Sequence, residues 1–398
     1  MKQTVLVLNA GSSSLKFALY DAHQLNRGTG TLLRGQIADI GQTPRAELKQ
    51  ADDALGDAAA TLFDTPVGHD HATLTDWLLQ RLQRLSDRFI LCGVGHRVVH
   101  GGQAFEAPVI ISPRVLDQLK ALIPLAPLHQ PHNLAPIEAI TGHFADVPQI
   151  ACFDTAFHRT QPELAELFAL PRRHADQGIL RYGFHGLSYD YIALQLPEHL
   201  PPDRRGRVVV AHLGHGASLC ALNDGRSIAT TMGFTALDGL PMATRCGALD
   251  AGVVLHLIQE KGMSPAAVSD LLYKQSGLLG LSGRSADMRT LLAADDAHSR
   301  QAIDYFCYHI ACWIGALAAA LGGLDALVFT AGIGENQPQI RARVVQRSAW
   351  LGAQLDPAGN DANARCISAA DSAVTTLVLP TNEEWMIARH TLTCLGLF

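Results

Sequence analysis

The chain has 398 residues, enough for two or three domains that each bury a core. With 48% hydrophobic and 17% charged residues, its composition is that of a soluble globular protein. A net charge of −6 argues against a nucleic acid or an anionic membrane as partner, because an acidic surface does not attract polyanions. Positive charge for an anionic substrate must therefore be local.

Cellular location is predicted from three features. An apolar strand begins by residue 5, which leaves no room for a signal peptide. The longest apolar segment, 310–324, contains three glycines and is shorter than a bilayer span, so we expect a buried core helix. Eight cysteines without a C-x-x-C pair favour buried free thiols in a reducing compartment. These features predict a cytoplasmic protein.

The first predicted element is a hairpin over residues 4–20, TVLVLNAGSSSLKFALY. An apolar strand stops at Asn9, three serines follow, and an alternating strand returns from Leu15. Its tip offers backbone N–H groups, hydroxyls, an amide and the Lys16 cation, which suit a phosphate and a metal ion. An ordinary Ser/Gly hairpin is the alternative.

The rest of the first half alternates strands and helices. Residues 23–70 are polar, with weak strand signals near Leu32 and Ile37. Residues 72–85 place leucines and a tryptophan on one helical face. Strands are expected at 90–102 and 147–158, and a proline-broken loop at 124–140 leads into a helix. This alternation predicts an α/β fold with sheets covered by helices.

The second half repeats the hairpin over residues 207–225, RVVVAHLGHGASLCALNDG, with Gly214 in the place of Gly11. A third apolar-to-glycine transition, preceded by a helix at 301–321, leads through a strand at 327–330 into the loop AGIGEN at 331–336. A strand over 376–384 and a helix over 385–395 close the chain. The repetition predicts a duplicated domain with a nucleotide between its halves. Chance similarity of two hairpins is the alternative.

Charged residues at the ends of apolar strands are the candidate functional groups, because ligands of α/β sheets bind there. They are Arg97, Asp154, His185, Arg245 and Glu383. Each alone also reads as structural: a satisfied histidine, a surface arginine or an N-cap aspartate. Together with the glycine turns they form a consistent site for an anionic substrate.

Eight ordered motifs identify a family resemblance. NAGSSSLKF, GHRVVHGG, the stretch around 127–129, FDTAFH, RYGFHGLS, SGLLGLSGRSADMR, FTAGIGEN and TNEE resemble the acetate kinase family, within the acetate and propionate kinase group. The resemblance implies a duplicated, actin-like two-domain α/β fold, as in sugar kinases and Hsp70-type ATPases, with mixed sheets flanked by helices. It assigns 1–155 plus 385–398 to the acetate and phosphate side, and 156–384 to the nucleotide side.

The resemblance also implies roles for individual residues. Asn9 and Glu383 would hold Mg²⁺ or Mn²⁺. The catalytic group would be Asp154, His185, Arg245 and Arg97, with Arg97 also binding the substrate. The pocket for the acyl methyl would be formed by Val99, Leu128 and Phe184. Nucleotide contacts would come from Ser12, Ser14, Lys16, His212, Leu213, Gly214, His215, Gly216, Asp287, Met288, Arg289, Gly332, Ile333, Gly334, Glu335 and Asn336.

The implied reaction is reversible, Mg²⁺-dependent transfer of a phosphoryl group from ATP to acetate, giving acetyl phosphate and ADP. Acetate is ionised at pH 7, so catalysis needs positioning and charge neutralisation rather than a strong base, and we expect direct in-line transfer. The family also implies a homodimer. The alternatives are a kinase for propionate or another short-chain acid, and a non-kinase actin-like ATPase, which would not need Arg97, Arg245 and His185 together.

The chain departs from the family pattern near the site. His215 stands where the family usually has Asn, Ala236 where it has Pro, and Cys246 where it has Ser. Ala248 and Ala251 replace the Asp and Pro of a family Asp-Leu-Asp-Pro segment. These changes put nucleotide contacts, the acyl pocket and the support of Arg245 in question, but none removes a member of the charged set.

Overall fold

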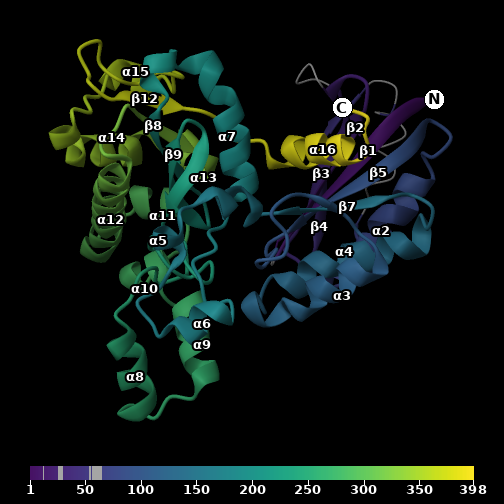
Figure 1. Cartoon of the computed structure of the whole chain (residues 1–398), viewed down its shortest axis with the longest axis horizontal. Coiled ribbons are helices and arrows are strands. Elements are labelled where there is room, and N and C mark those ends of the chain that lie inside the picture. The colour runs from purple at the N-terminus through teal and green to yellow at the C-terminus, as the bar shows by residue number, and fades with distance from the viewer. Residues whose placement is uncertain (12, 26–29, 53–54, 56–64) are drawn as a thin grey trace. The chain divides into compact units, whose positions relative to one another are not determined.

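The structure is a computed structural model that describes residues 1–398 except 12, 26–29, 53–54 and 56–64. The chain divides into two compact units, Met1–Phe157 with Asn382–Phe398, and His158–Thr381. Each unit has a sheet of its own (Figure 1). The roles predicted for the two domains, acetate and phosphate in one and nucleotide in the other, stay a prediction.

The first unit holds a seven-stranded mixed sheet in the order β4-β3-β2-β1-β5-β7-β6. β1 pairs antiparallel with β2 and parallel with β5, and β5 pairs parallel with β7. The predicted hairpin is confirmed, with Asn9 opposite Lys16. The strands are β1 (Lys2–Ala10), β2 (Leu15–Asp21), β3 (Thr31–Ala38), β4 (Arg45–Ala51), β5 (Phe89–Val98), β6 (Val109–Ile110) and β7 (Gln149–Phe153).

Helices cover both faces of this sheet. They are α2 (His71–Gln83), α3 (Pro113–Ala121), α4 (Gln130–His143) and α16 (Glu383–Cys394), with the short 3-10 turn η2 (Ile123–Leu125). A second 3-10 turn, η3 (Ala156–Thr160), lies where the chain passes from the first unit to the second. α2 begins where the Asp70 carboxylate accepts a hydrogen bond from Thr73 N. Its leucines join the core formed by β1, β2 and β3.

The glycines of β5 make room for α16 on the other face. A Cβ at Gly93 would lie 2.6 Å from the Leu395 side chain, and one at Gly95 would collide with Thr391 and Ile387. Val94, between them, faces the core that contains α2 instead. Glycine at these two positions therefore lets the last helix of the chain pack directly on the sheet.

The second unit holds a five-stranded sheet in the order β10-β9-β8-β11-β12. β8 pairs antiparallel with β9 and parallel with β11, which matches the arrangement of β1 with β2 and β5. The repeated hairpin is therefore confirmed. The strands are β8 (Arg207–Leu213), β9 (Ala217–Asn223), β10 (Arg226–Thr230), β11 (Ala326–Thr330) and β12 (Thr375–Val378).

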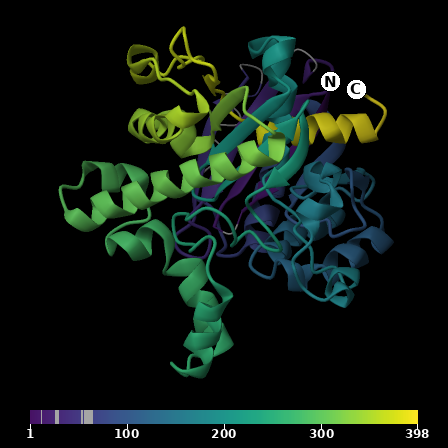
Figure 2. The same ribbon diagram turned by 60° about the vertical axis from the view of Figure 1, so that its left-hand side comes forward.

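The longest helix of this unit is α12, Ala297–Leu321 (Figure 2). By length and composition it is apolar enough to cross a membrane, and half of its most apolar window is buried. It packs on β8, β9 and β10, as a core helix does. The expected core helix is therefore confirmed, but the helix is longer than the apolar segment 310–324 because it begins at Ala297.

The remaining helices of the second unit are mostly short. They are α5 (Glu163–Glu166), α6 (Arg172–Asp176), α7 (Gly186–His199), η4 (Pro202–Arg204), α8 (Ala251–Gln259), α9 (Pro265–Lys274), α10 (Gly277–Ser282), α11 (Met288–Ala293), α13 (Ala331–Asn336), α14 (Pro338–Arg347), η5 (Ala349–Leu351) and α15 (Pro357–Asp361). The predicted loop AGIGEN is thus a helix, α13. The predicted strand over 376–384 ends early, at Val378.

All eight cysteines are free, as expected. Cys152, Cys220 and Cys307 are buried, whereas Cys312 and Cys366 are exposed. The expectation of burial therefore fails for these last two. Cys307 and Cys312 both lie on α12. Cys307 is on the buried face of this helix, and Cys312 is not.

Candidate active site

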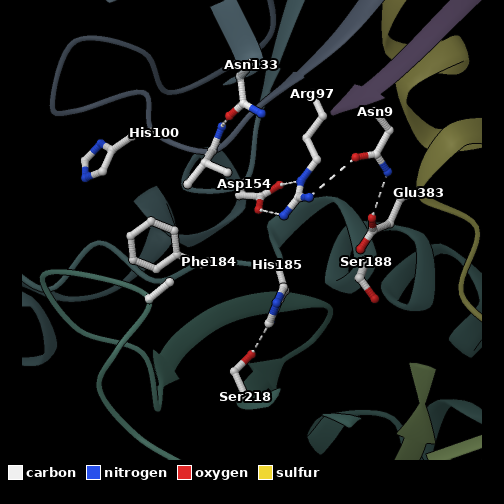
Figure 3. Close-up of polar contacts among 12 residues, drawn as sticks. Asn9, Arg97, His100, Asn133, Asp154, Phe184, His185, Ser188, Ser218 and Glu383 are labelled. Atoms are coloured by element: carbon white, nitrogen blue, oxygen red, sulfur yellow. Dashed lines mark hydrogen bonds and ion pairs between the residues drawn. The ribbon is translucent and has the colours of Figure 1, made fainter. Parts of the chain in front are cut away.

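The first unit gathers Arg97, Asp154 and Asn9 at one edge of its sheet. Asn9 lies near the end of β1, Arg97 near the end of β5, and Asp154 directly after β7. Because these three strands run parallel, their ends meet. The Arg97 guanidinium donates from Nε to Asp154 Oδ1 at 2.9 Å and from Nη2 to Asp154 Oδ2 at 2.5 Å (Figure 3).

Asp154 is buried, with 2% of its side chain exposed, and 18% of the Arg97 side chain is exposed. Burial alone would lower the pKa of Arg97, but the charge and hydrogen bonds of Asp154 raise this pKa above its usual value. Nη1 of Arg97 also donates toward Asn9 Oδ1 at 3.4 Å. The guanidinium therefore stays charged and has a fixed orientation, which suits a carboxylate or phosphoryl group.

Two adjacent glutamates at the start of α16 contact the Asn9 amide. Asn9 Nδ2 donates to Glu383 Oε2 at 3.3 Å and to Glu384 Oε1 at 3.2 Å. Glu384 is buried and also pairs with Arg34 Nη2 at 3.0 Å. The Lys16 ammonium lies 3.8 Å from Glu384 Oε1. Sequence reasoning named Glu383 and Lys16 but missed Glu384 and Arg34.

Asn9 and Glu383 fit a Mg²⁺ ion. Amide and carboxylate oxygens are hard ligands, and Mg²⁺ commonly takes only one or two protein carboxylates, with water and substrate phosphate in its other positions. The two side chains are in hydrogen-bond contact, so they reach the same point. Among the residues that the structure describes, no group of three or more His, Cys, Asp or Glu could hold a metal. The fit therefore rests on these two side chains.

The turn after β1 is held by two side chains from the helices. Asn133 Nδ2 donates to the Ala10 carbonyl at 2.7 Å, and its Oδ1 accepts from Val99 N at 2.9 Å. His71 Nε2 contacts the Gly11 carbonyl at 2.6 Å. Asn133 thus connects the segment after β1 to the segment after β5. Sequence reasoning missed both side chains, because neither stands at a strand end or in a motif.

The predicted phosphate-binding serines have different outcomes. Ser12 lies outside the described residues. The Ser14 carbonyl accepts from Gly11 N at 2.8 Å and closes the turn. The contribution of Ser14 visible in the structure is therefore made by its main chain.

The second unit stacks His185 on His212, with ring centroids 4.2 Å apart and planes 16° from parallel. His185 precedes α7 in a left-handed backbone conformation, φ 59° and ψ 23°. That conformation is uncommon for a residue with a Cβ and recurs at functional sites. Nδ1 of His185 is 2.8 Å from Ser218 Oγ, and Nδ1 of His212 is 2.8 Å from Ser188 Oγ (Figure 3 shows the first of these contacts).

Gly216 marks the point where Arg245 approaches His185. A Cβ at Gly216 would lie 3.2 Å from His185 Nε2 and 3.3 Å from Arg245 Nη2. Both groups therefore lie over one backbone position that glycine leaves open. Arg245 Nη1 donates to the Ala236 carbonyl at 2.7 Å, which fixes the guanidinium. A cation and an imidazole placed in this way can bind the oxygens of an anion.

A cavity of about 440 Å³ also lies in the second unit, within the usual range for small-molecule sites. The three segments predicted to contact nucleotide meet in its wall, which includes Gly214, His215, Asp287, Met288, Arg289, Gly332, Ile333 and Asn336. Leu213 and Gly334 are buried. Glu335 Oε1 accepts from Ala331 N at 2.8 Å and from Thr381 N at 3.2 Å, so this carboxylate caps α13.

Residues 4–389 match the Acetokinase family. The chain belongs to this family. An acetate kinase of Rhodopseudomonas palustris is 54% identical over 398 residues, which cover 98% of each chain. A solved propionate kinase of Francisella tularensis is similar with a TM-score of 0.85 at 35% identity, covering 98% of this chain and 99% of that one. A solved acetate kinase of Porphyromonas gingivalis has a TM-score of 0.82 at 34% identity, and the match covers 99% of this chain and 100% of that one.

Membership in the Acetokinase family confirms the predicted family and makes the chain a phosphotransferase. The solved acetate and propionate kinases also confirm the predicted fold, a duplicated actin-like α/β architecture with two mixed sheets flanked by helices.

Three departures from the acetokinase pattern have visible contacts. Ala236 supplies its carbonyl to Arg245, which a proline there would also supply. Cys246 Sγ donates to the Gly247 carbonyl at 3.2 Å, a weaker bond than a serine hydroxyl forms. Partial desolvation of the ring, followed by the charge of Arg245, lowers the pKa of His215 from its usual value.

The three residues predicted to surround the acyl methyl belong to different units. Val99 and Phe184 are buried, whereas Leu128 is 36% exposed. Val99 and Leu128 lie in the first unit and Phe184 in the second. The Phe184 carbonyl accepts from His158 Nε2 at 2.9 Å, which holds this segment in place. Their role as an acyl pocket stays a prediction.

Proposed function

We propose that this acetokinase transfers the γ-phosphoryl group of ATP to acetate and forms acetyl phosphate and ADP, reversibly and by direct in-line transfer. The observation that carries the proposal is the relationship to acetate kinases along essentially the whole chain, at up to 54% identity. The geometry agrees with it, because each unit presents an arginine that is fixed by hydrogen bonds beside other polar groups.

In this proposal Arg97 binds the acetate carboxylate, and Asp154 acts through Arg97. Asp154 makes two hydrogen bonds to the guanidinium, so its carboxylate is engaged in holding that cation. Acetate is already ionised at pH 7 and needs no proton acceptor. We therefore assign Asp154 to orienting Arg97, and not to general base catalysis.

Arg245 and His185 would bind the transferred phosphoryl group, since both lie over Gly216. ATP would occupy the cavity lined by Gly214 and α13. Asn9 and Glu383 would hold Mg²⁺, which neutralises phosphate charge when bound. Lys16 would add positive charge near the turn after β1. Transfer then depends on positioning and charge neutralisation, as in other phosphoryl transfers.

Trapping of acetyl phosphate with hydroxylamine tests the proposal. The hydroxamate should form only when acetate and ATP are both present. Arg97→Ala and Arg245→Ala should each lower turnover roughly 10³-fold or more, as loss of a transition-state arginine does. ATP hydrolysis that is equal with and without acetate would instead support a non-kinase ATPase.

Propionate is the second candidate acceptor, favoured by the alanine at 236 and by the likeness to a propionate kinase structure. Alanine lacks the ring carbons of the family proline, and one methylene of pocket space changes discrimination by about 1–3 kcal/mol. If Ala236 borders the acyl site, kcat/KM for propionate should lie within about tenfold of that for acetate. A propionate value far below this would leave acetate as the substrate.

We also propose a cytoplasmic homodimer, with α8 in the interface. Val253 and Leu255 on α8 are 41% and 54% exposed, and no residue of this apolar helix is buried within the chain. Two exposed apolar helices that meet would remove this surface from water. Light scattering should give twice the chain mass, and Leu255→Glu should shift the protein toward monomer.

A further inference from the structure

Two buried hydroxyl groups, those of Ser218 and Tyr189, form a hydrogen-bonded chain that ends at His185 Nδ1. Its Nδ1 lies 2.8 Å from Ser218 Oγ on β9, and Ser218 Oγ lies 2.5 Å from the Tyr189 hydroxyl on α7. Ser218 and Tyr189 are fully buried. Tyr189 N also donates to the His185 carbonyl at 3.1 Å, so the first turn of α7 fixes the histidine and the tyrosine relative to one another.

The chemistry of the three groups favours one direction of donation. A phenol is a stronger hydrogen-bond donor than an aliphatic alcohol, so Tyr189 donates to Ser218 in the short contact. The single hydrogen of Ser218 is then directed to His185 Nδ1, which accepts it. A neutral His185 in this arrangement carries its own hydrogen on Nε2, the nitrogen that faces Gly216 and Arg245.

The stacked partner, His212, is held in the opposite way. Ser188 Oγ donates to Thr381 Oγ1 at 2.9 Å, so its single hydrogen is already used. Ser188 Oγ must therefore accept from His212 Nδ1, 2.8 Å away. A neutral His212 then has its hydrogen on Nδ1 and a lone pair on Nε2, the nitrogen nearest Gly214.

We propose that the pairs Tyr189–Ser218 and Thr381–Ser188 fix His185 and His212 in opposite neutral tautomers. His185 presents Nε2–H as a donor to the transferred phosphoryl group, and His212 presents Nε2 as an acceptor near Gly214, in the wall of the proposed ATP cavity. Tyr189, Ser218, Ser188 and Thr381 are positioning residues that act through the two histidines. The inference rests on the proposed function only where it names the phosphoryl group and the nucleotide as the ligands of the two histidines.

Nitrogen-15 NMR of the protein without substrate tests the tautomers directly. The chemical shift of each ring nitrogen shows whether that nitrogen carries a hydrogen. We expect a protonated, pyrrole-like Nε2 in His185 and a pyridine-like Nε2 in His212. The opposite pattern, or the same tautomer in both rings, would overturn the proposal. The result does not depend on turnover, so it stands even if acetyl phosphate is not formed.

Tyr189→Phe removes the group that directs Ser218. His185 should become a mixture of tautomers, and kcat should fall about twofold to fivefold with KM for acetate unchanged, in proportion to the competent fraction. The matched control is Tyr182→Phe, since this buried tyrosine donates to the Gly178 carbonyl at 2.7 Å. Equal tautomer spectra and equal kcat in the two variants would overturn the role of Tyr189 in directing the hydrogen of Ser218 to His185.

Thr381→Val keeps the side-chain shape and removes the acceptor of Ser188. The Ser188 hydrogen is then available to His212 Nδ1, so His212 should change to the Nε2–H tautomer and KM for ATP should rise. The backbone bond from Thr381 N to Glu335 is retained in this variant. An unchanged His212 spectrum in a folded Thr381→Val protein would remove the second half of the proposal.

Discussion

Replacing Asp154 by Asn should destabilise the protein by about 3 kcal/mol. Removal of one partner from a buried ion pair costs about 3–5 kcal/mol, because the other charge is left uncompensated. Glu383 and Glu384 also face Arg97 and offset part of that charge, so we expect the lower end of the range. The asparagine amide would also turn an N–H group toward the guanidinium, donor against donor. At a unit of this size, 3 kcal/mol corresponds to a decrease in Tm of roughly 6–12 °C.

Thermal unfolding followed by circular dichroism measures the effect, and Glu138→Gln is the matched control. Glu138 pairs with Lys120 in the same unit at 2.7 Å, but both side chains are about half exposed. Exposed pairs contribute about 0–1 kcal/mol, so this control should lower Tm little. Acetate KM should rise only in Asp154→Asn. Equal melting of the two variants would refute the argument that the Arg97–Asp154 pair supports the site.

Because partial desolvation and the charge of Arg245 lower the pKa of His215, KM values for ATP in wild type and His215→Asn should follow the same pH dependence near pH 7 and diverge only below pH 6.5. Burial also lowers the pKa to about 4 in three histidines, which the folded state keeps neutral: His96, His100 and His158. Their contribution to stability is complete above pH 6.5 and is lost as the pH falls toward 4, at about 2 kcal/mol each by pH 5, so urea midpoints should fall steeply in that window. Ala236→Pro should shift the propionate-to-acetate ratio of kcat/KM toward acetate by about tenfold, and an unchanged ratio would place residue 236 outside the acyl site.

Strand ends were the part of the site that sequence predicted best. Asn9, Arg97 and Asp154 follow apolar runs, and parallel strands bring such ends to one sheet edge. The strand order β1-β5-β7 is therefore sufficient to bring these three side chains together. The same placement is wrong for His185, Arg245 and Glu383, since none of them follows a strand directly. His185 precedes α7 in a left-handed conformation, Arg245 lies in a loop, and Glu383 begins α16.

Supporting residues could not be predicted from the same rules. Asn133 lies within α4 and Glu384 follows the predicted ligand by one position, so neither pattern nor spacing separates them from surface polar residues. Their roles come from long-range contacts, to Ala10 and to Arg34. The AGIGEN segment was mistaken for a loop because its two glycines lower helix propensity, whereas Glu335 caps the helix from within.

The last helix has a consequence for the order in which the chain acquires its structure. Gly93 and Gly95 carry no side chain on the face of β5 against which α16 packs. Residues 382–398, which include α16, emerge from the ribosome only after the whole second unit has been made. The second unit is continuous in sequence, so it can complete its fold first, reversing the usual N-terminal-first order. Asn9 then meets Glu383 and Glu384 only at the final stage of synthesis. A nascent chain that stalls before α16 has the turn after β1 without these carboxylates, and the face of β5 that α16 covers stays exposed to solvent.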